Sequence, residues 1–418
     1  MHDEFPNDPA KEAPDLDRGV SRRSVLKLMA ASAALSGLTA CTKLPPEKIV
    51  PYVRAPEEII PGKPLFYATS MPHRGMGVGL LVESHMGRPT KVEGNPEHPA
   101  SLGASDIFAQ ASVLSLYDPD RSQVVLREGR ISEWPSFVSM VSKLRGELKS
   151  IRGAGLRILT GATSSPTFAD QMHRLLQQFP EAKWYAHEPC GAYASLEGAR
   201  LAFGKYLNTV HRFDQAAVVV SLDADFLSSG PAHVRHSRDF SNRRDPDGGS
   251  SSMNRLYVVE STYTNTGAMA DHRLPARCGE IENVARALAA AVGLPVSLQQ
   301  GGSPVPAEWL SALVRDLQRN RGASLVIAGE SQPAYVHALM HAINQSLGNV
   351  GKTIVYTDPI ELSPAVDSLP DLAKEIDAGQ VSALVMLGTN PASTAPVDLD
   401  FAKKMLKVPL RIHLGLYA

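Results

Sequence analysis

Short, almost wholly apolar segments recur from Arg152 onward, and helical segments with one apolar face separate them. Each apolar segment ends in small or polar residues. Strands that are apolar on both faces are expected where helices cover both sides of a parallel sheet. The pattern therefore predicts an α/β fold with doubly wound, Rossmann-like parallel sheets. The predicted strands are Leu156–Leu159, Ala216–Leu222, Leu256–Val259, Leu325–Ala328 and Ala383–Leu387, and the predicted helices are Thr167–Phe179, Tyr335–Leu347 and Phe401–Leu406.

The carboxyl ends of these strands carry residues that such a sheet uses to bind ligands. Asp223 and Asp225 follow one strand; they fit a divalent-metal site, but capping of the next turn or helix is the commoner role. The loop Gly161–Ser165 follows another strand and fits a phosphate cradle at a helix N-terminus. We expect this loop to be a feature inherited from a phosphate-binding ancestor, and not a site that binds phosphate in this protein.

A different pattern occupies residues 64–121. The apolar run Gly77–Glu83 is followed by the turn residues His85–Pro89 and then by Lys91–Glu93. This order predicts a β-hairpin within a small β-rich unit. With 418 residues the chain is long enough for several structural units, and we predict α/β domains over residues 122–418.

The first 41 residues have the features of an export signal. Arg22 and Arg23 form a twin-arginine pattern, and Leu28–Ala40 is an uncharged apolar stretch too short to span a bilayer. Leu38–Cys41 resembles a lipobox, in which Cys41 would be lipidated. The alternative is an amphipathic helix that happens to end in a cysteine. We expect twin-arginine export to the periplasmic face of the membrane, with residues 42–63 as a proline-rich tether.

Charge and cysteine content exclude some classes of function. The formal net charge is −1, from 42 basic and 43 acidic residues, which disfavours nucleic-acid binding. Three cysteines are too few for a four-thiolate metal site. A disulfide between Cys190 and Cys278 stays open if the protein reaches an oxidising compartment. The charge-balanced stretch from Arg235 to Asp245 is expected to be a solvated loop.

Four short segments, in this order, resemble the signatures of the molybdopterin oxidoreductases of the formate dehydrogenase and DMSO reductase type. They are Gly87–Pro99, Asp271–Pro275, Leu347–Gly351 and Leu387–Pro391. The run Cys41–Val53 and the later Gln110–Leu114 and Asp118–Arg121 resemble still more closely the large extracytoplasmic subunit of alternative complex III, a quinol-oxidising respiratory assembly. In that group the molybdopterin-like half is regarded as cofactor-free, and a cysteine-rich half carries iron–sulfur clusters. The resemblance implies that this chain is a truncated or split N-terminal half.

Active members of the wider family hold a four-iron cluster through cysteines near the glycine-arginine signature. Here the matching window Tyr67–Arg74 contains no cysteine, and neither does Gly94–Arg121. Since cluster ligation needs thiolates at short spacings, no cluster is expected there. Iron–sulfur clusters are expected in the missing half or in a partner. His73, His85 and His98 lack ligand spacing, so no metal site is predicted.

Cys190 lies roughly where family members place the metal-ligating residue, and Asn390 lies in the segment that resembles a strand end touching the pterin dinucleotide. Inert packing is the commoner role of a free cysteine. We therefore expect Cys190 and Asn390 to mark a vestigial pocket at most, with no catalytic residue and no bound cofactor.

Three functions remain open. The first is a non-catalytic scaffold in a membrane-bound quinol-oxidising complex, with membrane subunits and c-type haem subunits as partners. The second is an active molybdopterin-dependent oxidoreductase without the first cluster. The third is a periplasmic lipoprotein that binds a small molecule at the sheet edge.

Overall fold

The computed structural model describes Lys27 and residues 58–191, 193–230, 232–245, 253–298, 304–360 and 368–417. Arg22, Arg23, Cys41 and most of the predicted tether lie outside the described residues. The chain divides into Met1–Glu58 and a compact unit, Ile59–Ala418. Within the described part, no helix combines the length and the apolar character that crossing a membrane requires.

A three-stranded antiparallel sheet opens the compact unit. Its strands are β1 (Leu65–His73), β2 (Met76–His85) and β3 (Arg88–Gly94), in that spatial order. The predicted hairpin is confirmed as the β2–β3 pair. Strand β1 was not predicted, because most of its side chains are exposed and it shows no apolar alternation. A small core of Val78, Leu80, Val92 and Ala109 joins this sheet to helix α2 (Ile107–Ala111).

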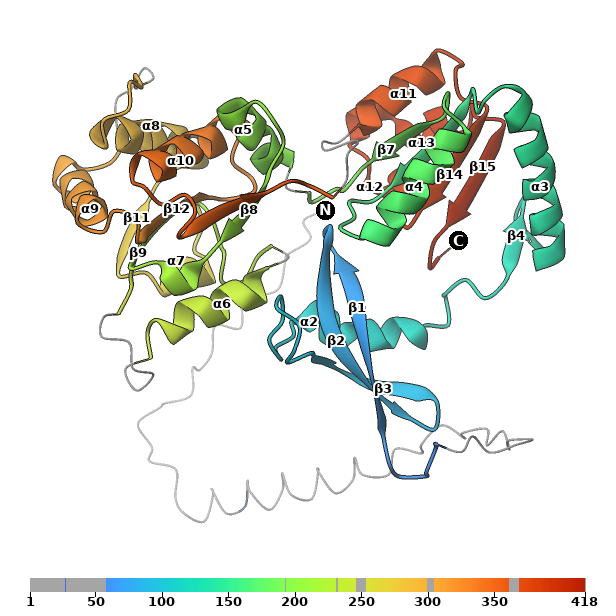
Figure 1. The fold of residues 1–418 in the computed structure, drawn as a ribbon, viewed down its shortest axis with the longest axis horizontal. Coiled ribbons are helices and arrows are strands. Elements are labelled where there is room, and N and C mark those ends of the chain that lie inside the picture. Colours follow the sequence, from blue (N-terminus) through green and yellow to red (C-terminus); the bar gives the residue numbers. More distant parts are fainter. Residues whose placement is uncertain are drawn as a thin grey trace, which may run out of the picture. The chain divides into compact units, whose positions relative to one another are not determined.

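The first parallel sheet has the order β11-β10-β9-β12. Its strands are β9 (Val218–Leu222), β10 (Arg255–Glu260), β11 (His272–Pro275) and β12 (Ser324–Ala328). One face packs on helices α8 (Ile281–Ala291), α9 (Ala307–Arg319) and α10 (Ala334–Ser346), and the other packs on α6 (His233–Asn242) (Figure 1). Alternate residues explain this: Val218 and Val220 face α10, whereas Val219 faces α6.

The second parallel sheet has the order β15-β14-β6-β7. Its strands are β6 (Leu156–Thr160), β7 (Lys183–Ala186), β14 (Ala383–Leu387) and β15 (Leu410–Leu414). Helices α3 (Trp134–Ser150) and α4 (Pro166–Gln178) pack on one face, and α11 (Leu369–Asp377) and α13 (Phe401–Met405) on the other (Figure 1). The predicted α/β fold with parallel sheets is confirmed.

The first sheet is inserted between the two halves of the second. The chain forms β6 and β7, continues into the first sheet, and returns to form β14 and β15. Its outward and return paths pair as an antiparallel ribbon of β8 (Asn208–His211) and β13 (Ile354–Thr357). This connection brings residues of β8 next to the first sheet.

The prediction of a solvated loop from Arg235 to Asp245 was wrong over most of its length, because α6 covers His233–Asn242. Arg235 pairs with Asp239 one turn later, and Phe240 is buried. Arg235 also donates to the carbonyl of Pro99 at 2.7 Å, and Arg238 donates to that of Leu102. These two arginines therefore hold the loop that follows β3 against α6.

Candidate functional site

A cavity of about 650 Å³ lies at the carboxyl ends of β9 and β12. Such a volume is within the usual range for small-molecule sites. Its walls come from β8, α6, α10 and the loops after β9, β10 and β12. Polar groups on these walls include Thr209, Asp223, Asp225, Ser261, Thr264, Glu330, Cys278 and four histidines, and apolar ones include Phe226, Val326, Ile327, Met340 and Ile354.

The two aspartates are already bonded to neighbouring loops. Asp223 accepts from the backbone N–H of Ser261 at 2.9 Å and from the Gln332 amide at 2.9 Å. Asp225 accepts from the backbone N–H and the hydroxyl of Thr266, at 3.0 and 2.7 Å. These partners lie 38 to 109 residues away in the chain, so the bonds join separate loops and differ from the capping of the next turn or helix that the sequence favours. Among the described residues, no group of three or more His, Cys, Asp or Glu side chains is arranged to hold a metal ion.

Four histidines line the cavity: His211 from β8, His236 from α6, and His337 and His341 from α10. Burial lowers the pKa of His211 to about 3, with help from the nearby His236 and His337. Burial likewise lowers the pKa of each of the other three to about 4. At neutral pH all four imidazoles are therefore uncharged.

The charge of the lining is consequently negative. Asp223, Asp225 and Glu330 contribute carboxylates, and none of the described lining residues is a lysine or arginine. The lining residue Glu330 is paired with Arg74, which lies at the tip of the β1–β2 hairpin. The strand ends also meet closely, since a Cβ added at Gly329 would lie 2.0 Å from the carbonyl oxygen of Asp223.

These residues do not fit a pterin dinucleotide. Its diphosphate needs cationic side chains or free backbone N–H groups, as phosphate sites in proteins provide. The cavity offers carboxylates and neutral imidazoles, and the Ser261 N–H already donates to Asp223.

The residues predicted to mark a vestigial pocket lie elsewhere. Neither Cys190, in the loop after β7, nor Asn390, after β14, lines the cavity. The Cys190 carbonyl accepts from Arg74, and the Asn390 carbonyl accepts from the backbone N–H groups of Ser393 and Thr394. In the loop Gly161–Ser165, Ser165 caps α4 by accepting from the N–H of Phe168. Cys190 and Cys278 are both free and exposed.

The histidine cluster was not predicted from the sequence. Its members come from three elements that are far apart in the chain. One signal was present, because His337 and His341 are four residues apart on a helix and so share a face. The other two join them only through the β8–β13 ribbon and the packing of α6.

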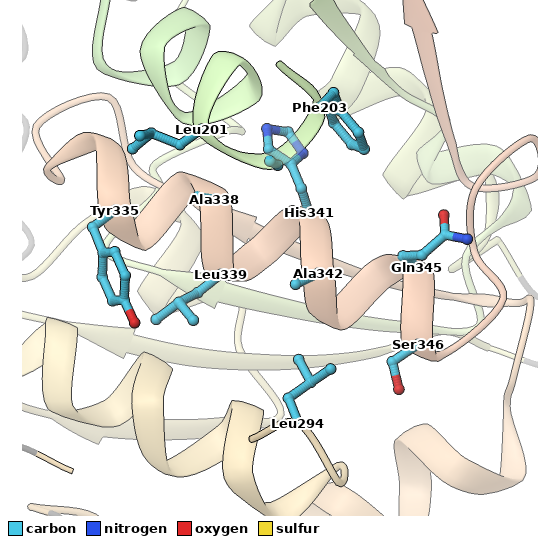
Figure 2. Close-up of a pocket in the computed structure, with 11 residues that line it drawn as sticks. Leu201, Phe203, Leu294, Tyr335, Ala338, Leu339, His341, Ala342, Gln345 and Ser346 are labelled. Carbon is cyan, nitrogen blue, oxygen red and sulfur yellow. The ribbon is translucent and has the colours of Figure 1, made fainter. Parts of the chain in front are cut away.

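A second hollow, of about 490 Å³, lies between α5 (Tyr193–Phe203) and α10. Figure 2 shows His341 rising from α10 beside Phe203, with ring centroids 5.3 Å apart. Leucine, alanine and aromatic side chains make up most of the wall, and the described lining carries no acidic or basic group other than His341.

Comparison with known proteins gives one informative match. The chain is 24% identical over 379 residues to the molybdopterin-binding-like subunit of menaquinone reductase from Nitratidesulfovibrio vulgaris. The match covers 80% of this chain and 54% of the relative, so the chain spans about half the length of that protein. A molybdopterin-oxidoreductase-like relationship is supported. No family model matches the chain.

Among solved structures, the formyltransferase/hydrolase complex from Methylorubrum extorquens with methylofuran is similar at a TM-score of 0.45 and 15% identity. The superposition covers 70% of this chain and 81% of that one. A similarity at this level carries no inference about function.

Proposed function

We propose that the chain is a non-catalytic, molybdopterin-oxidoreductase-like subunit of a membrane-bound, quinone-linked electron-transfer complex. The relative's name, a molybdopterin-binding-like subunit of menaquinone reductase, supports the class of complex. The non-catalytic role is inferred from the lining of the strand-end cavity. Its carboxylates would repel the diphosphate of a pterin dinucleotide, and its uncharged histidines would not attract it.

The β-rich unit supports the same proposal. Its hairpins occupy residues 65–94, and the whole stretch from Glu58 to Arg121 contains no cysteine. An electron-carrying cluster in this unit would need four thiolates, and imidazole or hydroxyl groups are poor substitutes. Electrons would then pass through partner subunits, among them c-type haem and iron–sulfur proteins, while this chain positions them.

Co-purification tests this proposal. A tagged chain expressed in its own host should be solubilised with mild detergent and purified from membranes beside an unrelated tagged lipoprotein as the control. We expect quinone-linked membrane subunits with c-type haem and iron–sulfur partners to accompany the chain and not the control. Recovery of a lone, monodisperse protein from native membranes would contradict the proposal.

We also propose export by the twin-arginine route and a lipid anchor at Cys41. Replacing Arg22 and Arg23 together by lysine should leave the precursor in the cytoplasm. C41A should remove the lipid and release exported protein into the soluble periplasmic fraction unless its partners retain it. Mass spectrometry of the N-terminal peptide decides the second point, since an unlipidated mature Cys41 contradicts the anchor.

A further inference from the structure

The turn that joins β1 to β2 holds an arginine in an unfavourable backbone conformation. His73 pairs with Met76, which leaves Arg74 and Gly75 as a two-residue turn. Both have positive φ, 48° and 82° respectively. Turns of this kind favour Asn or Gly, because a left-handed backbone brings the Cβ of other residues close to the following carbonyl oxygen. The contacts of the Arg74 side chain can explain why an arginine occupies this position.

The Arg74 guanidinium reaches the ends of two strands that belong to different sheets. Its Nε and Nη2 atoms donate to the carbonyl oxygen of Cys190, at 3.1 and 2.6 Å. Nη2 also pairs with the Glu330 carboxylate. Cys190 follows β7 of the second sheet, whereas Glu330 follows β12 of the first.

The rest of the turn fits against the same region. A Cβ at Gly75 would lie 3.0 Å from the Cβ of Ala162, in the loop after β6, so a larger residue would press on that loop. Met76 lines the cavity at the first sheet. The turn therefore touches the loops that follow β6, β7 and β12.

We propose that the Arg74-Gly75 turn is an internal ligand, which we call the Arg74 latch, that ties the carboxyl ends of the two parallel sheets together. The guanidinium supplies to this region a positive charge that an anionic ligand would need, and Glu330 and the Cys190 carbonyl already use it. The Arg74 side chain thus joins the loop after β7 to the loop after β12.

Two backbone N–H groups, one beside each partner of Arg74, can report on the latch through their rates of hydrogen exchange. The Gly191 N–H donates to the Glu188 carbonyl at 3.0 Å, beside Cys190. The Gln332 N–H donates to the Gly329 carbonyl at 3.0 Å, beside Glu330. Because charge-assisted bonds at Arg74 hold both loops, opening of either loop should become easier when Arg74 is lost.

The test compares amide exchange by mass spectrometry in the full chain and in R74M, R74K and E330Q. R200M is the matched control, since Arg200 pairs with Glu197 on the surface of α5. We expect R74M to speed exchange of residues 188–191 and 329–332 together, by roughly tenfold. The control should change neither peptide.

The two milder variants separate the arms of the latch. R74K keeps a charge for Glu330 but loses the second donor to Cys190, so exchange should rise more at 188–191 than at 329–332. E330Q should show the opposite order. These variants also serve if R74M fails to fold. Faster exchange confined to the hairpin, or equal responses to R74K and E330Q, would overturn the proposal.

Discussion

The two parallel sheets are built alike, yet their carboxyl edges differ. Each has four strands with helices on both faces and small or polar residues where the strands end. At the first sheet those residues line a cavity with buried histidines. At the second, Ser165 caps a helix and the carbonyls of Cys190 and Asn390 are hydrogen-bonded within the chain. The same sequence pattern therefore predicts a fold but not a ligand.

The strongest test of the comparison is whether each sheet has its own core. Phe213 is fully buried and stacks on Phe226 at 4.3 Å beneath the first sheet, and Phe401 is buried against the second. F213A and F401A should each lower the free energy of unfolding by about 3–5 kcal/mol, through lost burial and a cavity. Denaturant titration measures both. Little loss in either variant would mean that the corresponding sheet does not depend on that core.

Loss of an arginine from a buried ion pair should destabilise the first parallel sheet more than the second. Glu260 is only 1% exposed and pairs with Arg273. R273M would leave this buried carboxylate without its cation and should lower the free energy of unfolding by about 3 kcal/mol. Glu375, at the second sheet, is shared by Arg157 and Lys183 and should keep a partner in R157M. R273M should therefore destabilise more than R157M.

The double variant R273M/E260M is the control for that explanation. Removing both charges should recover most of the stability that R273M loses, because no unpaired carboxylate is then left at position 260. If the double variant is as unstable as R273M, packing of the arginine, and not its charge, explains the loss.

Acid should affect the first sheet more than the second. The buried His337 and His341 have pKa values lowered to about 4, whereas unfolded histidine titrates near 6.5. Their contribution to stability is complete above pH 6.5 and is lost as the pH falls toward 4, because the unfolded chain binds the protons. Each histidine adds up to about 1.4 kcal/mol per pH unit to this slope.

H337Q should therefore flatten the loss of unfolding free energy between pH 6.5 and 4. H413Q, at an exposed position of β15, is the matched control and should leave the slope unchanged. Unfolding curves at a series of pH values provide the measurement. Identical slopes for H337Q and the unsubstituted chain would show that His337 is accessible to protons in the folded state.

The smallest expected change in stability is at the loop Gly161–Ser165, which precedes α4. Ser165 accepts from the N–H of Phe168 at 3.2 Å as the N-cap of α4. S165A should cost about 1 kcal/mol of stability. S164A, one residue earlier, removes a hydroxyl outside the cap and should cost less. Equal losses would argue against the capping role.

Buried strands were predictable because both of their faces are apolar, as in β6, β9, β10, β12 and β14. Strand β1 was missed since most of its side chains are exposed. Helix α6 was missed because its charged residues outnumber the buried apolar side chain, Phe240. The cavity histidines come from β8, α6 and α10, and the Arg74 contacts join residues more than a hundred positions apart. Local pattern does not encode such long-range contacts.

The most direct measurement is the molybdenum, tungsten and pterin content of the folded chain purified from native membranes. An active molybdopterin oxidoreductase from the same membranes serves as the positive control. The acidic, histidine-lined cavity and the paired Arg74 predict no metal or pterin above background. Near-stoichiometric molybdenum or tungsten with pterin in this polypeptide would contradict the non-catalytic account.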